Sequence, residues 1–148
     1  MPDSPTPQNA RTQLAALTGL VATGKFDPQI TARFGPPVAD SRAAAVLILF
    51  GVLDALPSDH DAEQTAVSRD LDVLLLARAT TLRAHPGQVA FPGGRLDPGD
   101  DGPVDAALRE AREETGPDPP GVARPGTLRP IPPALSRHTV TAGRAWWR

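Results

Sequence analysis

The chain has 148 residues, 40% of them apolar, and a formal net charge of −2. This length limits it to one domain with a modest core. The near-neutral charge argues against bulk attraction to nucleic acid or to a membrane surface, and no apolar run is long enough to span a membrane. The chain contains no cysteine, which excludes disulfides and thiol chemistry, and we expect a cytoplasmic protein.

The N-terminal quarter is predicted to contain a tail and a helical segment. Residues 1–8 are polar and bear prolines, which predicts a disordered tail. Residues 9–23 place apolar side chains at helical spacing, so we expect a first helix within a helical segment at 9–37. One domain is then expected over residues 38–148.

Short apolar runs separated by polar loops predict a set of strands. The run at 43–53 indicates a buried strand, although a short helix fits the same pattern. Further strands are predicted at 71–77, 88–91, 126–131 and 139–147, with loops at 57–69, 95–102 and 117–124. One helix is expected from Pro103, which favours a first helical turn, to near Thr115, before the stop signal at Gly116-Pro117. Strands around one strong helix predict a mixed α/β or α+β domain.

Three of the chain's four glutamates lie within five residues, at Glu110, Glu113 and Glu114. On a helix, offsets of three and four residues place these side chains along one face. Like charges this close repel one another unless a cation neutralises them, and clustered oxygen ligands suit Mg²⁺ or Mn²⁺. The alternative is a solvated acidic helix face laced with Arg–Glu pairs.

A pair of glycines precedes this helix, at Gly93 and Gly94. We expect them to form a sharp turn in which the backbone approaches a ligand closely, with the carbonyl of Gly94 joining the carboxylates around a metal. Glu110 and Glu114, four residues apart, are the pair expected to grip one ion. Ions held this way neutralise a diphosphate and lower the pKa of an attacking water.

Glu113 lies beside that pair and is expected to bind a second ion or a metal-bound water. Arg109 precedes it by four residues, so the two side chains are expected to pair on the helix surface. This pairing would orient the Glu113 carboxylate. Trp146 and Trp147 end the last predicted strand, where one ring would face the core and the other the opposite side of the sheet.

These residues resemble the signature of the Nudix hydrolases. The signature runs Gly, five residues, Glu, seven residues, then Arg-Glu-apolar-x-Glu-Glu-x-Gly-apolar, and the chain matches it at Gly94, Arg109, Glu110, Glu113, Glu114 and Gly116. Asp100 replaces the first Glu, and eight residues separate it from Arg109. The resemblance implies an α/β/α sandwich with a mixed sheet. It also implies Mg²⁺- or Mn²⁺-dependent cleavage of a nucleoside diphosphate linked to another group, with Glu113, Arg109 and Glu110 as catalytic residues.

A second motif resembles the element that marks coenzyme A pyrophosphatases of this superfamily. It comprises residues 74–79, Arg83, Gly87 and residues 91–94, with departures at Leu76 and Ala79. The resemblance implies hydrolysis of coenzyme A to 3′,5′-ADP and 4′-phosphopantetheine. It assigns binding of this small nucleotide substrate to Arg78, Arg83, Gly87 and Phe91. Arginine side chains suit this task because a guanidinium binds phosphate oxygens bidentately.

By the same resemblance, further strands and a second long helix should follow Gly116. Residues 126–148 contain no candidate for that helix, so we expect the closing part of the fold to be missing and one sheet face to be exposed. A homodimer or a partner segment would cover it. Two other functions stay open: a Nudix hydrolase of ADP-ribose or of an oxidised nucleotide, and a non-catalytic Nudix-like binding or regulatory domain.

Overall fold

The computed structural model describes residues 11–12, 14–16, 19, 23, 39–52, 71–83, 85–116, 122–128, 130 and 138–147. The expected tail at 1–8 and the expected loop at 57–69 lie outside these residues. Between residues 11 and 19 the described positions are helical, in agreement with the first predicted helix. No helix in the described part of the chain has the length and apolar character needed to cross a membrane.

A five-stranded mixed sheet is built around β1 (Arg42–Gly51). Along one edge β1 pairs in parallel with β7 (His138–Trp146), from Arg42 opposite His138 to Phe50 opposite Trp146. β6 (Ala123–Thr127) then pairs antiparallel with β7. The run of β-branched and aliphatic residues in β1 favours such a central, doubly paired strand.

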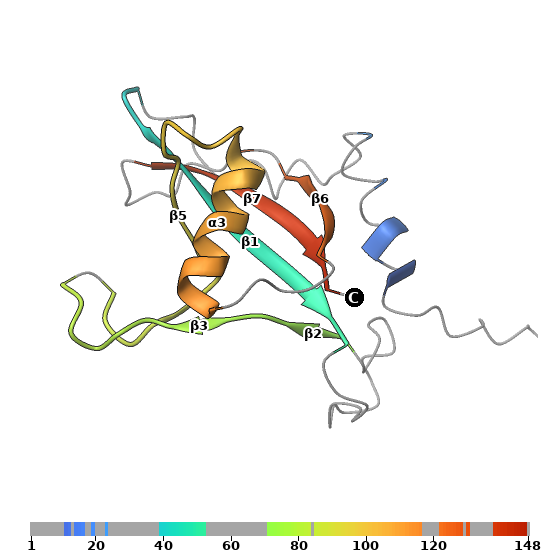
Figure 1. Cartoon of the computed structure of the whole chain (residues 1–148), viewed down its shortest axis with the longest axis horizontal. Coiled ribbons are helices and arrows are strands. Elements are labelled where there is room, and N and C mark those ends of the chain that lie inside the picture. The colour runs from blue at the N-terminus through green and yellow to red at the C-terminus, as the bar shows by residue number, and fades with distance from the viewer. Residues whose placement is uncertain are drawn as a thin grey trace, which may run out of the picture.

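The other edge of β1 carries two short antiparallel strands, β2 (Asp72–Val73) and β5 (Gly93–Arg95). Between them the chain forms a separate two-stranded ribbon of β3 (Leu76–Ala77) and β4 (Val89–Ala90). In Figure 1 this ribbon lies below the C-terminal end of the helix α3. The connection from β4 to β5 is short, so the ribbon leads directly into the strand that borders the site described below.

Helix α3 (Pro103–Thr115) has the bounds that the sequence predicts. Pro103 occupies its first turn, where a missing backbone N–H costs no helical hydrogen bond. The helix ends at Gly116, whose φ of 95° is a conformation that side chains rarely adopt. The Gly116 N–H donates to the carbonyl of Arg112 at 3.0 Å, which satisfies one of the last helical carbonyls.

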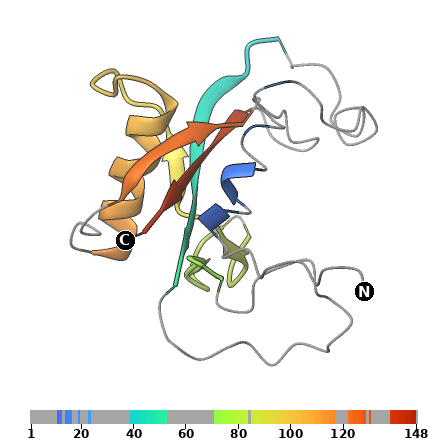
Figure 2. The same ribbon diagram turned by 90° about the vertical axis from the view of Figure 1, so that its right-hand side faces the viewer.

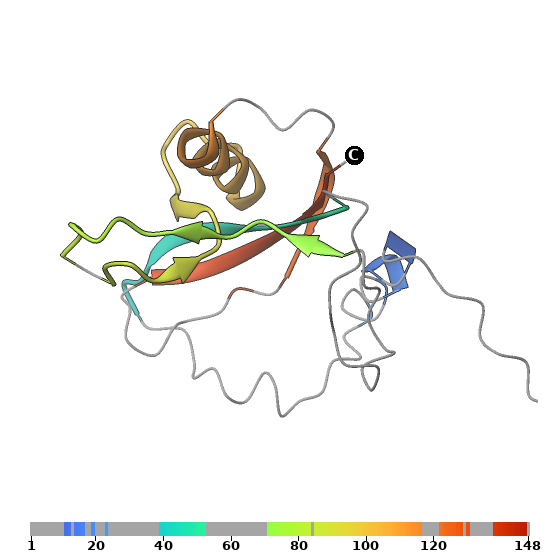
Figure 3. The same ribbon diagram turned by 90° about the horizontal axis from the view of Figure 1, so that it is seen from below.

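The core lies between α3 and one face of the sheet, as Figures 2 and 3 show from two directions. Alternate residues of β1 face the helix, and Leu47 and Leu49 are almost fully buried there. The helix contributes small side chains to this contact: Ala106, Ala107 and Ala111. Small residues let the helix approach the sheet closely, which gives tight contact but only a modest core. Trp147 packs against this core, as expected for one of the two tryptophans.

The mixed α+β class with a mixed sheet is confirmed, but three sequence predictions of elements need correction. The strand predicted at 71–77 is divided into β2 and β3, because the chain leaves β1 after Leu74, whose N–H still donates to Leu49. The strand predicted at 126–131 begins at Ala123, inside the predicted loop 117–124, because Ala123 pairs with Trp146 of β7.

The third correction concerns Gly93 and Gly94, which do not form the predicted sharp turn. Both lie in β5, where Gly93 pairs with Val46 and Gly94 with Ala45. The turn prediction was wrong because it used the local preference of glycine alone. Pairing with a strand that is distant in sequence overrides that preference.

Candidate functional site

Arg109 is the centre of a polar network at the edge of the sheet. Its Nε and Nη2 donate to the two carboxylate oxygens of Asp100 at 2.9 and 3.0 Å. Nη2 also donates to the Arg95 carbonyl at 3.1 Å. The Asp100 side chain is only 4% exposed, so this two-pronged pair is shielded from water on the carboxylate side. A bidentate pair of this kind fixes the plane of the guanidinium.

The remaining nitrogen of Arg109 reaches the glutamates of α3. Nη1 donates to Glu110 Oε1 at 3.1 Å and lies 3.5 Å from Glu113 Oε2. The predicted contact between Arg109 and Glu113 is therefore present. The Glu110 side chain is 20% exposed and that of Glu113 is 60% exposed, so Glu110 is held against the protein while Glu113 extends into solvent.

Strand β5 contacts two carboxylates of the site, those of Glu114 and Glu110. The Gly93 N–H donates to Glu114 Oε2 at 3.0 Å, which ties the last turn of α3 to the strand. At Gly94, a Cβ atom would lie closer than 3.0 Å to the Glu110 carboxylate. The absence of a side chain at Gly94 therefore lets the Glu110 carboxylate lie directly on the strand. The two glycines act through a close approach rather than through a turn.

The network is charged across the ordinary pH range. The hydrogen bond from Arg109, with a second from the Asp97 N–H, lowers the pKa of the Asp100 carboxyl below its usual value of 3.8. The same bond to Asp100, with a smaller contribution from Glu110, raises the pKa of Arg109. The charges of Asp100 and Arg109 stabilise each other, so the carboxyl stays ionised and the guanidinium stays protonated near neutral pH.

The substitution Asp100→Asn tests this network by its pH dependence. A carboxyl whose pKa is lowered by folding stabilises the native state above its unfolded pKa, and this contribution disappears as the pH falls through the folded value. We therefore expect the wild type to be more stable than the variant at neutral pH. The difference should shrink below about pH 4. Urea unfolding at a series of pH values measures it, and a difference independent of pH would contradict the assignment.

The three helix glutamates do not form a preassembled metal cage. Among the described residues, no three His, Cys, Asp or Glu side chains gather in an arrangement that could hold an ion. Glu110 turns one oxygen to Arg109 and Glu114 turns one to the Gly93 N–H. The donor set is all oxygen and anionic, which is the chemistry that hard divalent cations prefer. The residues therefore suit such an ion, and each carboxylate keeps a second oxygen with which to ligate it.

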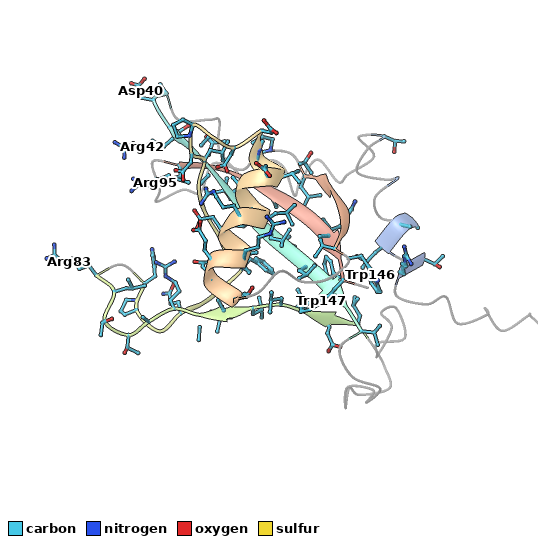
Figure 4. All side chains as sticks on the ribbon, viewed as in Figure 1. Asp40, Arg42, Arg83, Arg95, Trp146 and Trp147 are labelled. Atoms are coloured by element: carbon cyan, nitrogen blue, oxygen red, sulfur yellow. The ribbon has the colours of Figure 1, made fainter. Side chains whose placement is uncertain are left out.

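The predicted substrate residues are gathered on the β3–β4 ribbon and its continuation. The Arg78 N–H donates to Gln88, and the Gly87 N–H donates to Arg78, at 2.9 and 3.2 Å. Phe91 follows β4 and is 37% exposed. In Figure 4, Arg83 lies at the tip of the ribbon and points away from α3. The ribbon thus brings these residues together, but Arg83 lies apart from the helix glutamates.

The sequence places Asp100 at the position of the signature's first Glu but does not predict its pairing with Arg109, although the structure makes it the main partner of that arginine. The available signal was the turn Asp97-Pro98-Gly99-Asp100, in which the Asp97 N–H donates to Asp100 Oδ2 at 2.7 Å and the Asp100 N–H to the Asp97 carbonyl. Aspartate readily closes turns of this kind. The turn directs the Asp100 carboxylate toward α3. This compensates for the shorter side chain of aspartate, which stands where the signature has glutamate.

Comparisons with known proteins find relatives of part of this chain. A 59-residue stretch, 40% of this chain, is 52% identical to an uncharacterized Nudix hydrolase NudL of Cronobacter sakazakii and covers 31% of that protein. The corresponding protein of an Enterobacter strain is 51% identical over the same length and share. The chain thus matches about a third of the length of these curated relatives. The crystal structure of a Nudix hydrolase from M. smegmatis, RenU, gives 24% identity and a TM-score of 0.48, covering 72% of this chain and 61% of that one.

A family model decides the classification. The model of the NUDIX domain matches residues 60–146, which is more than half of the chain and includes α3, the β3–β4 ribbon, β6 and β7. The site residues Asp100, Arg109, Glu110, Glu113 and Glu114 all lie inside the matched range. The chain belongs to the Nudix family.

Proposed function

We propose that this chain hydrolyses a nucleoside diphosphate linked to a second group, with coenzyme A as the substrate. The observation that carries the proposal is the network of Arg109, which holds Glu110 and Glu113 on one guanidinium while Asp100 fixes that guanidinium from behind. Such pre-organised charge is costly to build and is typical of sites that act on charged groups.

Nudix hydrolases generally use divalent metal ions, and we propose Mg²⁺ or Mn²⁺ here. Glu110 and Glu114 would hold the ion with the carbonyl of Gly94, and Glu113 would take a second ion or a bound water. When bound, such an ion offsets the charge of a diphosphate and lowers the pKa of water. Arg109 orients the carboxylates of Glu110 and Glu113, because its Nη1 donates to Glu110 Oε1 and lies 3.5 Å from Glu113 Oε2.

The β3–β4 ribbon supports a phosphorylated substrate. Arg78 and Arg83 are exposed on it, and the sequence from Val73 to Leu96 contains no carboxylate. An anion approaching this ribbon therefore meets positive charge without a competing negative group. Arginine is suited to the role because its planar fork matches two phosphate oxygens at once.

One observation favours a second candidate, a binding domain without catalysis. The carboxylates of α3 do not converge within the described residues, and a domain that only binds nucleotides needs no assembled ion site. Calorimetric titration with Mn²⁺ separates the candidates. A hydrolase should bind the ion through Glu110 and Glu114, whereas a binding domain need not.

Turnover of coenzyme A with and without a divalent ion tests the main proposal. We expect release of 3′,5′-ADP in Mg²⁺ or Mn²⁺, and none when EDTA removes the ion, because the diphosphate charge is then unopposed. ADP-ribose and an oxidised nucleotide serve as comparison substrates. Turnover of either one without turnover of coenzyme A would reject the substrate assignment but keep the hydrolase.

A further inference from the structure

Exposed large apolar side chains are concentrated on the β3–β4 ribbon and the segment that leads into it. Within the described residues, these side chains are Val52, Val73, Leu75, Leu82, Val89 and Phe91. All but Val52 lie between residues 73 and 91, and Val89, at 64% exposed, is the most exposed of them. Single exposed residues of this kind are normal on a soluble protein. A contiguous group of them marks a site of interaction.

Strand alternation places most of these side chains on one face of the ribbon. Val73 pairs with Phe50, and Ala77 pairs with Val89. Paired residues of antiparallel strands share a face, and so do residues two positions apart. Leu74, which points to the other side, packs against the core that α3 covers. The face that points away from α3, here called the outer face, therefore comprises Val73, Leu75, Ala77, Val89 and Phe91.

The segment from Asp72 to Ala77 is apolar on both faces. Leu74 and Leu76 are half-buried, whereas the alternate positions of the outer face are exposed. A strand with one face in water normally carries polar residues there, and strands that are apolar on both faces are typically covered on both. In Figures 1 and 3 the ribbon extends past α3 and away from the five-stranded sheet. The exposure of its outer face shows that no described element covers it.

The outer face also carries no charge. All five of its side chains are aliphatic or aromatic, and Arg78, which follows Ala77, falls on the opposite face by alternation. Arg83 lies at the tip of the ribbon. Nucleic acid or an anionic lipid surface would require cations on the face itself. The surface that matches the outer face is therefore apolar and uncharged.

We propose that the outer face binds the outer face of a second copy of this chain, so that two ribbons pack face to face about a two-fold axis. A two-fold contact joins identical patches, which must be self-complementary. The outer face is self-complementary because it is uniformly apolar, so two copies meet without burying an unpaired charge. Packing removes these side chains from water. A contact of this small size gives a weak, reversible dimer.

Sedimentation velocity of the whole chain, from micromolar to millimolar protein, tests the dimer. It needs no substrate, so its outcome is independent of the proposed hydrolase function. We expect the wild type to change from monomer to dimer without larger species, because a two-fold contact closes at two copies. The dimer should persist at high NaCl, since no ion pair holds it. A wild type that stays monomeric throughout, that forms larger assemblies, or whose dimer dissociates as salt rises would overturn the proposal.

Val89→Glu and Gln88→Glu form a matched pair of variants. Both place a glutamate at an exposed position of the ribbon, but neighbouring residues of a strand point to opposite faces. Val89→Glu puts the carboxylate on the outer face, where each dimer would bury it twice. We expect dimerisation to weaken by about 30-fold or more, the effect of losing a central interface residue. Gln88→Glu should dimerise like the wild type.

Thermal unfolding checks that both variants are folded, as expected for substitutions at exposed positions. If Val89→Glu does not fold, Leu75→Gln, an uncharged change on the outer face, replaces it and should weaken the dimer in the same direction. A dimer that survives the change on the outer face, or that Gln88→Glu weakens equally, contradicts the assignment of this surface.

Discussion

Glu114→Gln is expected to lower turnover of coenzyme A by about 10²-fold or more, because it removes a proposed ligand of an ion that contributes several kcal/mol of transition-state stabilisation. The substitution removes the negative charge while keeping the size of the side chain. Its amide oxygen can still accept the hydrogen bond that the Gly93 N–H donates to Glu114 at 3.0 Å. The tie between α3 and β5 should therefore persist, and the loss should come from the charge alone.

Steady-state kinetics and thermal unfolding, measured on the same preparation, check this expectation. The unfolding midpoint should stay close to that of the wild type while kcat falls. Glu63→Gln is the matched control, because Glu63 is the one glutamate outside the cluster. The proposed role of Glu114 would be refuted by a variant that keeps its turnover, or by one whose activity falls only in proportion to its folded fraction.

The sequence predicts the extent of helix α3 because its signals are local. Pro103 fits only an early helical position, and Gly116 adopts a φ of 95° immediately after the last turn. The offsets among Glu110, Glu113 and Glu114 then follow from helix geometry without any tertiary information. Arg109 and Glu113 meet for the same reason. The spacing of residues in the sequence was therefore enough to predict the parts of the site that lie on one helix.

Contacts between segments that are distant in the sequence could not be predicted in this way. The pairing of Gly93 with Val46 joins β5 to β1, two strands that lie far apart in the sequence. Nothing in the glycine pair itself distinguishes a strand from a turn. The bidentate bond between Asp100 and Arg109 depends on a loop that folds back onto the helix. The position of the β3–β4 ribbon relative to α3 likewise depends on packing. These features arise from tertiary structure, which overrides local preference.

Gly94 illustrates how the two levels combine, and its replacement by alanine should separate activity from stability. A Cβ at this position would collide with the carboxylate of Glu110. The colliding atoms are at the end of a rotatable side chain, so Glu110 can swing away and the fold should lose only about 1–3 kcal/mol. The carboxylate would leave its place beside Arg109, and displacement of a reacting group by about 1 Å costs roughly 10²-fold in rate.

Gly99→Ala is the matched control, since nothing lies within 4 Å of the Cβ position in that loop. We expect Gly99→Ala to keep the turnover and the unfolding free energy of the wild type, while Gly94→Ala loses turnover out of proportion to its stability. Equal losses of turnover in the two variants would mean that the absence of a side chain at Gly94 has no part in positioning the Glu110 carboxylate. A large stability loss in Gly94→Ala, with normal activity per folded molecule, would show that β5 needs this glycine for pairing with β1 instead. The ratio of the two losses therefore distinguishes a glycine that seats a catalytic carboxylate from one that only builds the sheet.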